Sequence, residues 1–158
     1  MPSTIDPHSF GFMLADMARL NRAEFDRRIV GSGLGITPAE SRTLFHVAHA
    51  GGERQNVIAE RMGVEAMTVS GLIDRLEARG LVAREPDPTD RRAKLVRPTD
   101  AAEAMLAATR DLANDVRDAA MRGIDPAEWQ QMLTTMKRAH ANLLSLRAGS
   151  CERESNAA

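Results

Sequence analysis

The sequence predicts a mainly helical protein with one small β-hairpin, an α+β fold class that follows from three observations. Apolar residues recur at steps of three and four along most of the 158-residue chain, as they do in amphipathic helices. Residue combinations that begin helices precede several of these stretches. The segment from about 81 to 97 instead carries two short β-prone runs, separated by a polar segment that contains prolines.

The first helix is expected from about Phe10 to Ile29. Residues 10–18 are apolar on almost every side, and a helix without a polar face is usually buried on several sides. We therefore expect this half of the helix to pack against a second subunit. The glycine-rich residues 31–35 are expected to form a loop.

The start of the second helix is marked by three residues. Thr37 can cap the helix, Pro38 occupies the first helical position, and Glu40 lies where a carboxylate completes a capping box. This helix is expected to run to about Ala50 and to end at the glycines that follow.

Residues 56–97 contain two further helices, a turn between them and then the hairpin. The first of these helices ends at Gly63, and the second runs from about Glu65 to Arg79. Gly80 can stop the second helix because a residue without a Cβ atom adopts a positive φ at little cost. The apolar residues of the second helix fall on one face: Val69, Leu72, Ile73 and Leu76.

The opposite face of this second helix begins with small and short polar side chains. Such side chains allow a helix to approach base edges, and Ser or Thr hydroxyls can bond to bases or phosphates. An ordinary amphipathic surface helix is the alternative, so the adjoining hairpin decides between the two interpretations. The residues of this face are Met67, Ser70, Gly71, Asp74 and Arg75, with Thr68 at its edge.

The predicted hairpin pairs residues 81–84 with residues 94–97 and carries a loop at residues 86–93. Pro86 and Pro88 cannot donate ladder hydrogen bonds, which favours a projecting arm over a central strand. The cations in this segment are Arg84, Arg91, Arg92, Lys94 and Arg97, and the anions are Glu85, Asp87 and Asp90.

The excess of arginine at the tip of the hairpin suits a narrow minor groove of enhanced negative potential. Asp90 lies two residues before Arg92 and is placed to hold its guanidinium. The alternative is a solvated hairpin with a local ion pair of little energy. Two helices with a short glycine-containing turn, followed by a basic hairpin, indicate a winged helix-turn-helix, which contacts DNA.

Two motifs are specific in combination: the LEARGLV run at residues 76–82 and the DPTDRR wing at residues 87–92. With these motifs the sequence resembles the MarR family of bacterial regulators, and the resemblance extends from about Phe10 to Leu146. It implies a homodimeric transcription factor, usually a repressor released by a small molecule or an oxidant. It also implies that the second helix enters the major groove and the wing arginines the minor groove. The residues expected to contact DNA are Gln55, Ala66, Met67, Thr68, Ser70, Gly71, Arg75, Asp90, Arg91, Arg92 and Lys94.

Two more helices are expected after the hairpin. One begins near Asp100 and Glu103, which have capping-box spacing, and the other begins at Asp125 after a break at Gly123. Their apolar seams favour a helical dimer interface, although spacing alone also fits a monomeric helical core. The seams are Met105, Thr109, Leu112, Val116 and Ala119, then Trp129, Met132, Met136, Ala139 and Leu143.

The chain is therefore divided into four parts. Residues 1–35 are a dimerisation helix, and residues 36–98 are the winged lobe. Residues 99–147 are further dimerisation helices, and residues 148–158 are expected to form a disordered polar tail.

Composition excludes several other classes of protein. The net charge of −1 provides no overall basic field, so DNA binding must depend on local patches. No leader peptide or membrane segment is expected, and the single cysteine, Cys151, fits a reducing cytoplasm. No catalytic constellation or phosphate loop is recognised, so we expect neither an enzyme nor a cofactor.

A small aromatic or anionic effector is expected between the dimer helices and the DNA-binding lobe. Its candidate residues are Met13, Met17, Arg19, Phe45 and His46. The family's oxidant sensors use a cysteine near the start of the first helix, which is absent here, so a ligand is favoured over oxidation. His46 and His49 share a helix face and leave a metal-responsive regulator open, and a winged-helix module for protein contact is a further alternative.

Overall fold

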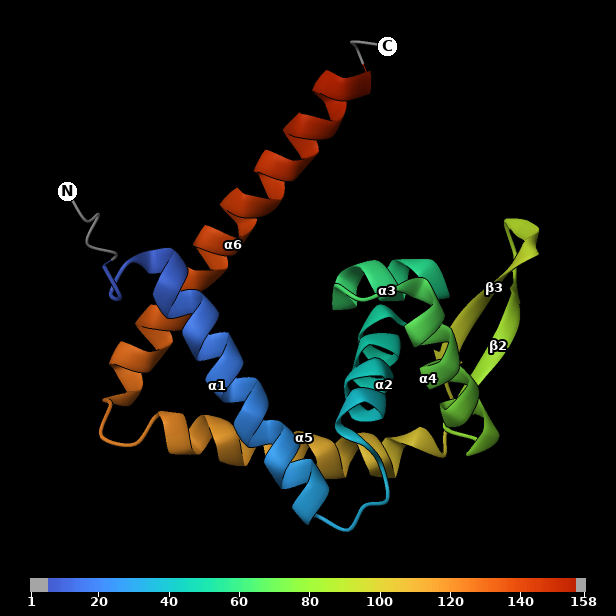
Figure 1. Cartoon of the computed structure of the whole chain (residues 1–158), viewed down its shortest axis with the longest axis horizontal. Coiled ribbons are helices and arrows are strands. Elements are labelled where there is room, and N and C mark those ends of the chain that lie inside the picture. The colour runs from blue at the N-terminus through green and yellow to red at the C-terminus, as the bar shows by residue number, and fades with distance from the viewer. Residues whose placement is uncertain (1–5, 156–158) are drawn as a thin grey trace. The chain divides into compact units, whose positions relative to one another are not determined.

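The computed structural model describes the backbone of residues 6–155 and the side chains of residues 6–90 and 92–146 (Figure 1). In chain order it contains α1 (Phe10–Gly31), α2 (Pro38–Ala50), β1 (Glu53–Arg54), α3 (Gln55–Met62), α4 (Ala66–Ala78), β2 (Val82–Asp87), β3 (Asp90–Pro98), α5 (Ala102–Ala120) and α6 (Pro126–Ser155). The chain divides into two compact units, and the boundary follows Val116 within α5. The winged lobe belongs to the first unit, together with α1 and most of α5.

The helix ends form largely as the local sequence predicts. The capping box of α2 is complete, because Thr37 Oγ1 accepts from the Glu40 amide at 3.2 Å and Glu40 Oε2 accepts from the Thr37 amide at 3.0 Å. Gly63 and Gly80 end α3 and α4 with φ of 65° and 69°, respectively. The capping box expected at Asp100 does not form among the described side chains; backbone carbonyls accept the first amide hydrogens of α5 instead.

The hairpin belongs to a three-stranded antiparallel sheet of order β1-β3-β2. Figure 1 shows this twisted hairpin extending beside α2, α3 and α4, with its tip beyond the helices. The eight-residue loop predicted at residues 86–93 is wrong, because β2 and β3 continue outward until Asp87 pairs with Asp90. Pro86 is tolerated within β2 because that strand lies at the edge of the sheet.

Strand β1 is the element that the sequence did not predict. Glu53 and Arg54 pair with Val96 and Leu95 of β3. Two residues between a glycine pair and a helix are too few to display an alternating pattern.

The core lies where α4 packs against α2, α3 and the sheet. The apolar face predicted for α4 is buried, and Val69, Ile73 and Leu76 are fully inaccessible to solvent. Ile29 of α1 and Ala102 of α5 join the same cluster. The core therefore includes residues from both sides of the 36–98 segment that was expected to form the lobe. The other core residues include Leu44, Val47, Ile58, Val82 and Val96.

Helix α6 continues to Ser155, so residues 148–155 are helical where a disordered tail was expected. No proline follows Pro126 to interrupt the helix. The last three residues of that expected tail, 156–158, lie outside the described residues, and so does the Cys151 side chain. Among the described residues, no helix combines the length and apolar character needed to cross a membrane.

The turn of the hairpin is held by the Asp87 carboxylate, which is 7% exposed. Asp87 Oδ1 accepts from the Thr89 hydroxyl at 2.7 Å and from its amide at 2.8 Å. Asp87 Oδ2 accepts from Arg54 Nε at 2.8 Å, which ties the turn to β1. The hydrogen bonds from Thr89, followed by that from Arg54, lower the pKa of Asp87 to about 2.

Because this pKa is lowered in the folded state, Asp87 contributes stability above its ordinary pKa of 3.8, and that contribution is lost as pH falls towards 2. We expect Asp87→Asn to melt at a lower temperature than the wild type at pH 7, and the difference to shrink between about pH 4 and pH 2. Thermal melts across this range check it. Asp100→Asn, at an exposed carboxylate, is the matched control, and a difference that is independent of pH would contradict the assignment.

Candidate nucleic-acid interface and adjacent cavity

The outward face of α4 presents the residues predicted to contact DNA. Met67 is 86% exposed, and Ala66 and Thr68 beside it are also exposed. Ser70 and Gly71 are half-buried. Because serine is small and glycine has no side chain, neither residue projects far from the helix surface. Between Ala66 and Gly71 this face therefore carries no large charged residue that would keep the helix away from the floor of a groove; the charged residues Asp74 and Arg75 follow further along.

The cations of the hairpin fall into two groups. Arg84 pairs with Asp74 and Glu77 of α4, so it attaches the base of the hairpin to that helix. Arg97 pairs with Glu85 at 3.0 Å across the strands. Arg92 and Lys94 are exposed and form no ion pair with any described residue, while the side chain of Arg91 lies outside the described set. The available positive charge is thus concentrated on β3 towards the tip.

Asp90 does not hold the Arg92 guanidinium, which corrects the sequence prediction. Its Oδ1 accepts from the Arg92 backbone amide at 3.0 Å, and its Oδ2 lies 3.5 Å from Arg54 Nη2. The carboxylate therefore shapes the backbone at the start of β3 and leaves the Arg92 side chain free to turn. A backbone amide two residues along is the usual partner of an Asp side chain in a turn.

Gln55 begins α3 and lies beside a cavity of about 370 Å³ between that helix and the sheet. Arg54, Asn56 and Lys94 line the same cavity. Sequence reasoning did not identify Arg54, because its role depends on strand β1, which the sequence did not predict. Its pKa is raised, chiefly by the hydrogen bond to Asp87, so its charge is committed to the hairpin turn.

Arg75 of α4 is bound to Glu40 of α2. Arg75 Nε donates to Glu40 Oε1 at 2.9 Å; the arginine side chain is 59% exposed, whereas that of Glu40 is only 7% exposed. Burial acts to raise the pKa of Glu40, but hydrogen bonds from Thr37 and Arg75 outweigh it and lower the pKa. One edge of the guanidinium is thus fixed to the protein, and the remainder faces solvent. Sequence reasoning named Arg75 but not its partner, which lies 35 residues away.

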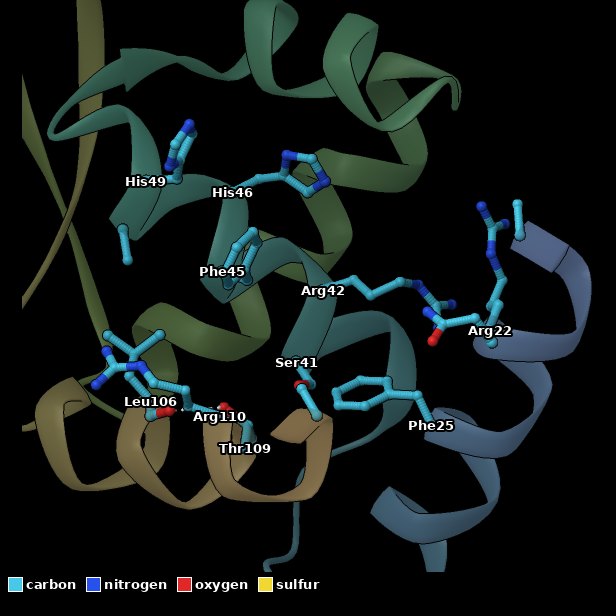
Figure 2. A pocket seen from close by; sticks show the side chains of 14 residues that line it. Arg22, Phe25, Ser41, Arg42, Phe45, His46, His49, Leu106, Thr109 and Arg110 are labelled. Atoms are coloured by element: carbon cyan, nitrogen blue, oxygen red, sulfur yellow. Dashed lines mark hydrogen bonds between the residues drawn. The ribbon is translucent and has the colours of Figure 1, made fainter. Parts of the chain in front are cut away.

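A larger cavity of about 630 Å³ lies between α1, α2 and α5 (Figure 2). Its apolar walls include Phe25, Phe45 and Leu106, and its cations are Arg22, Arg42 and Arg110. The full lining is Ala18, Asn21, Arg22, Phe25, Ser41, Arg42, Phe45, His46, Ala48, His49, Leu106, Thr109, Arg110 and Ala113.

The cations of this cavity differ in their partners. Arg42 forms an ion pair with Asp26. Arg22 and Arg110 form no ion pair with any described residue. Burial, followed by the charges of His49 and Arg61, lowers the pKa of His46, which favours a neutral imidazole at pH 7. Aromatic walls with two unpaired guanidinium groups fit a planar anion.

The predicted effector residues divide between this cavity and the surface. Phe45 and His46 line the cavity, and their role in binding an effector stays a prediction. Met13 and Met17 do not line it; they are exposed along α1. Arg19 is also outside the cavity and pairs with Asp16 on the same helix. Arg22 and Arg110 were missed because their approach depends on how α1 and α5 fold around α2.

His46 and His49 do not form a recognisable metal site within the described residues. The ring of Phe45 contacts both histidines: it stacks on the His49 ring with centroids 6.1 Å apart and meets the His46 ring edge-on with centroids 6.0 Å apart. No group of three or more potential His, Cys, Asp or Glu ligands occurs in the described part of the chain. The geometry of the pair is that of an aromatic cluster at the cavity wall.

The helices α2–α4 and the three-stranded sheet define a winged helix-turn-helix protein, with α4 in the position of the recognition helix. Comparison with known proteins gives the same class and adds a family. Residues 34–93 match the family model described as the MarR family.

Solved structures extend the match over most of the chain. A transcriptional regulator called PA3341 is 36% identical, with a TM-score of 0.71, over 87% of this chain and 99% of its own. The apo form of MarR from E. coli is 20% identical, with a TM-score of 0.72, over 83% and 96% of the two chains. BpsR of Bordetella bronchiseptica is 24% identical, with a TM-score of 0.67, over 86% and 96%. This chain belongs to the MarR family of transcriptional regulators.

Proposed function

We propose that this regulator is a homodimeric, sequence-specific DNA-binding protein, a repressor that a small aromatic anion releases from a pseudo-palindromic operator. The observation that carries the DNA-binding part is the distribution of ion pairs in the hairpin. Arg84 and Arg97 are neutralised by neighbouring carboxylates, whereas Arg92 and Lys94 are exposed without a described partner. In a chain of net charge −1, these are the local cations that can replace phosphate counterions. We place the protein in the cytoplasm, where it meets its DNA.

Dimerisation is supported by apolar surface that a single chain leaves exposed. On α1, Phe10 is 65% exposed, and Phe12, Met13, Leu14, Met17 and Leu20 are also exposed. In the second compact unit, α6 exposes Met136, Leu143 and Leu144. Apolar surface of this extent is costly in water and marks an interface. A two-fold dimer would place its recognition helices about 34 Å apart, one turn of DNA.

Effector release is supported by the place of α2 between the cavity and the recognition helix. Ser41, Arg42 and Phe45 on one face of α2 line the cavity, whereas Glu40 on the other binds Arg75 of α4. A ligand that shifts α2 would therefore move the anchor of an arginine on the DNA-facing helix. In the similar protein BpsR, DNA binding is regulated by 6-hydroxynicotinic acid, which is a small aromatic acid.

Arg92→Ala should weaken DNA binding more than Arg84→Ala, because Arg92 is free at the wing while Arg84 is committed to Asp74 and Glu77. The loss should affect every site, relax any preference for A·T-rich flanks and reduce the salt slope by about one for each phosphate contact removed. Fluorescence anisotropy at two salt concentrations, on the DNA that flanks the protein's own gene, measures this. Unchanged affinity of Arg92→Ala would remove the wing's assigned role. No binding by the wild type would favour the protein-contact alternative.

The protein should have twice its 17.2 kDa chain mass in solution at micromolar concentration, as light scattering would report. Replacing both Met13 and Met17 by Glu should shift it towards the monomer, because charge in an apolar interface is not compensated. Val30→Glu, at another exposed apolar position of α1, should leave the mass unchanged. A single-chain mass for the wild type would exclude the proposed assembly.

Benzoate or 6-hydroxynicotinic acid should raise the melting temperature by about 3–6 °C at ten times its Kd. Arg22→Ala and Arg110→Ala should each reduce the shift, because their guanidinium groups are the unpaired cations of the cavity. Arg19→Ala is the matched control, since Arg19 lies on α1 but outside the cavity. Benzyl alcohol tests the need for negative charge. Equal loss of the shift in all three arginine variants would contradict this site.

A further inference from the structure

Met67 is the most exposed of the large apolar side chains that the structure describes. Its exposed fraction is 86%, and it is the second residue of α4. A methionine exposed to this degree in the free protein gains nothing from the core. Its side chain is long, flexible and polarizable, so it can adapt to an irregular apolar surface.

The neighbours of Met67 make it the longest side chain at the start of this helix face. Ala66, Thr68, Ser70 and Gly71 are all small, and Gly71 has Arg75 Nη1 as its nearest neighbour, 3.7 Å from where a Cβ would lie. Arg75 lies two helical turns further on and is anchored to Glu40. The first turns of α4 therefore present one apolar arm between short side chains and no long hydrogen-bond donor.

We propose that Met67 contacts the C5-methyl group of a thymine in the major groove and thereby selects thymine at one position of each operator half-site. The inference rests on the proposed DNA-binding function and deepens it. The N-terminal residues of a recognition helix are those that meet base edges, and Met67 has this position. A thioether offers no hydrogen-bond donor, and the thymine methyl is the apolar group that distinguishes base pairs in the major groove.

The surroundings argue against a protein partner at this position. Apolar interfaces between proteins are contiguous patches. The neighbouring residues of the α4 surface are small, and the other exposed large apolar residue near this turn is Val64, at 42%. A single apolar arm among hydroxyls and glycine suits contact with one methyl group in a polar groove.

The experiment begins by selecting binding sites from a randomised duplex library with the wild-type protein. Each thymine of the selected site is then replaced by deoxyuridine, which removes the methyl group and keeps base pairing. Wild-type affinity, measured by anisotropy, should fall about fourfold for one thymine of each half-site, as the loss of one buried apolar carbon predicts. Met67→Ala removes the contact from both half-sites of the dimer, so it should bind the unmodified site about sixteenfold more weakly and should be insensitive to deoxyuridine at that same thymine.

Two further variants sharpen the comparison. Met67→Leu keeps an apolar arm and should retain part of the sensitivity to deoxyuridine. Val30→Ala, at an exposed apolar residue of α1, should behave as the wild type. The inference is overturned if Met67→Ala keeps the wild-type sensitivity at every thymine, or if the wild type is sensitive at none. If the wild type selects no sequence at all, the proposed DNA-binding function fails first, and this inference fails with it.

Discussion

The burial of one face of α4 is the constraint on which the rest of the lobe depends. Val69, Ile73 and Leu76 are withdrawn completely from water, and each such side chain contributes on the order of 1.5–3 kcal/mol to folding. A helix whose apolar stripe is fixed in this way cannot rotate without exposing that stripe. Its opposite face, with Met67 at one end and Arg75 further along, is consequently held outward.

Ion pairs then determine which charges remain available. With 21 basic and 22 acidic residues, the chain has no general attraction for a polyanion. Carboxylates of α4 bind Arg84, and Asp87 binds Arg54, so these arginines hold the hairpin in place. The cations left over on β3 are few but concentrated. A nearly neutral protein can acquire a local basic site by pairing most of its arginines elsewhere.

Helix α2 borders both the cavity and α4, because its two faces carry different residues. One face carries Leu44 and Val47 into the core and places Glu40 against Arg75. The other carries Phe45 and His46 to the wall of the cavity. The capping box of Thr37 and Glu40 makes the same carboxylate part of the helix start and part of the contact with α4. Packing and the Glu40–Arg75 hydrogen bond join α2 to α4, so under the proposed function a ligand in the cavity would act on α4 through these contacts.

Local chemistry in the sequence determined the helices and most of their ends, since a cap, a proline or a glycine acts on neighbouring residues; the start of α5 and the end of α6 are the exceptions. It also determined the buried face of α4, because helical periodicity depends on no distant partner. The tertiary structure alone decided which arginines are free, since Arg84 meets Asp74 and Arg54 meets Asp87 only after folding. It decided β1, whose two residues become a strand by pairing with β3. It also decided that Arg22 and Arg110, and not Arg19, line the cavity. A cavity between three helices depends on how the helices pack, which the apolar periodicity of a single helix does not specify.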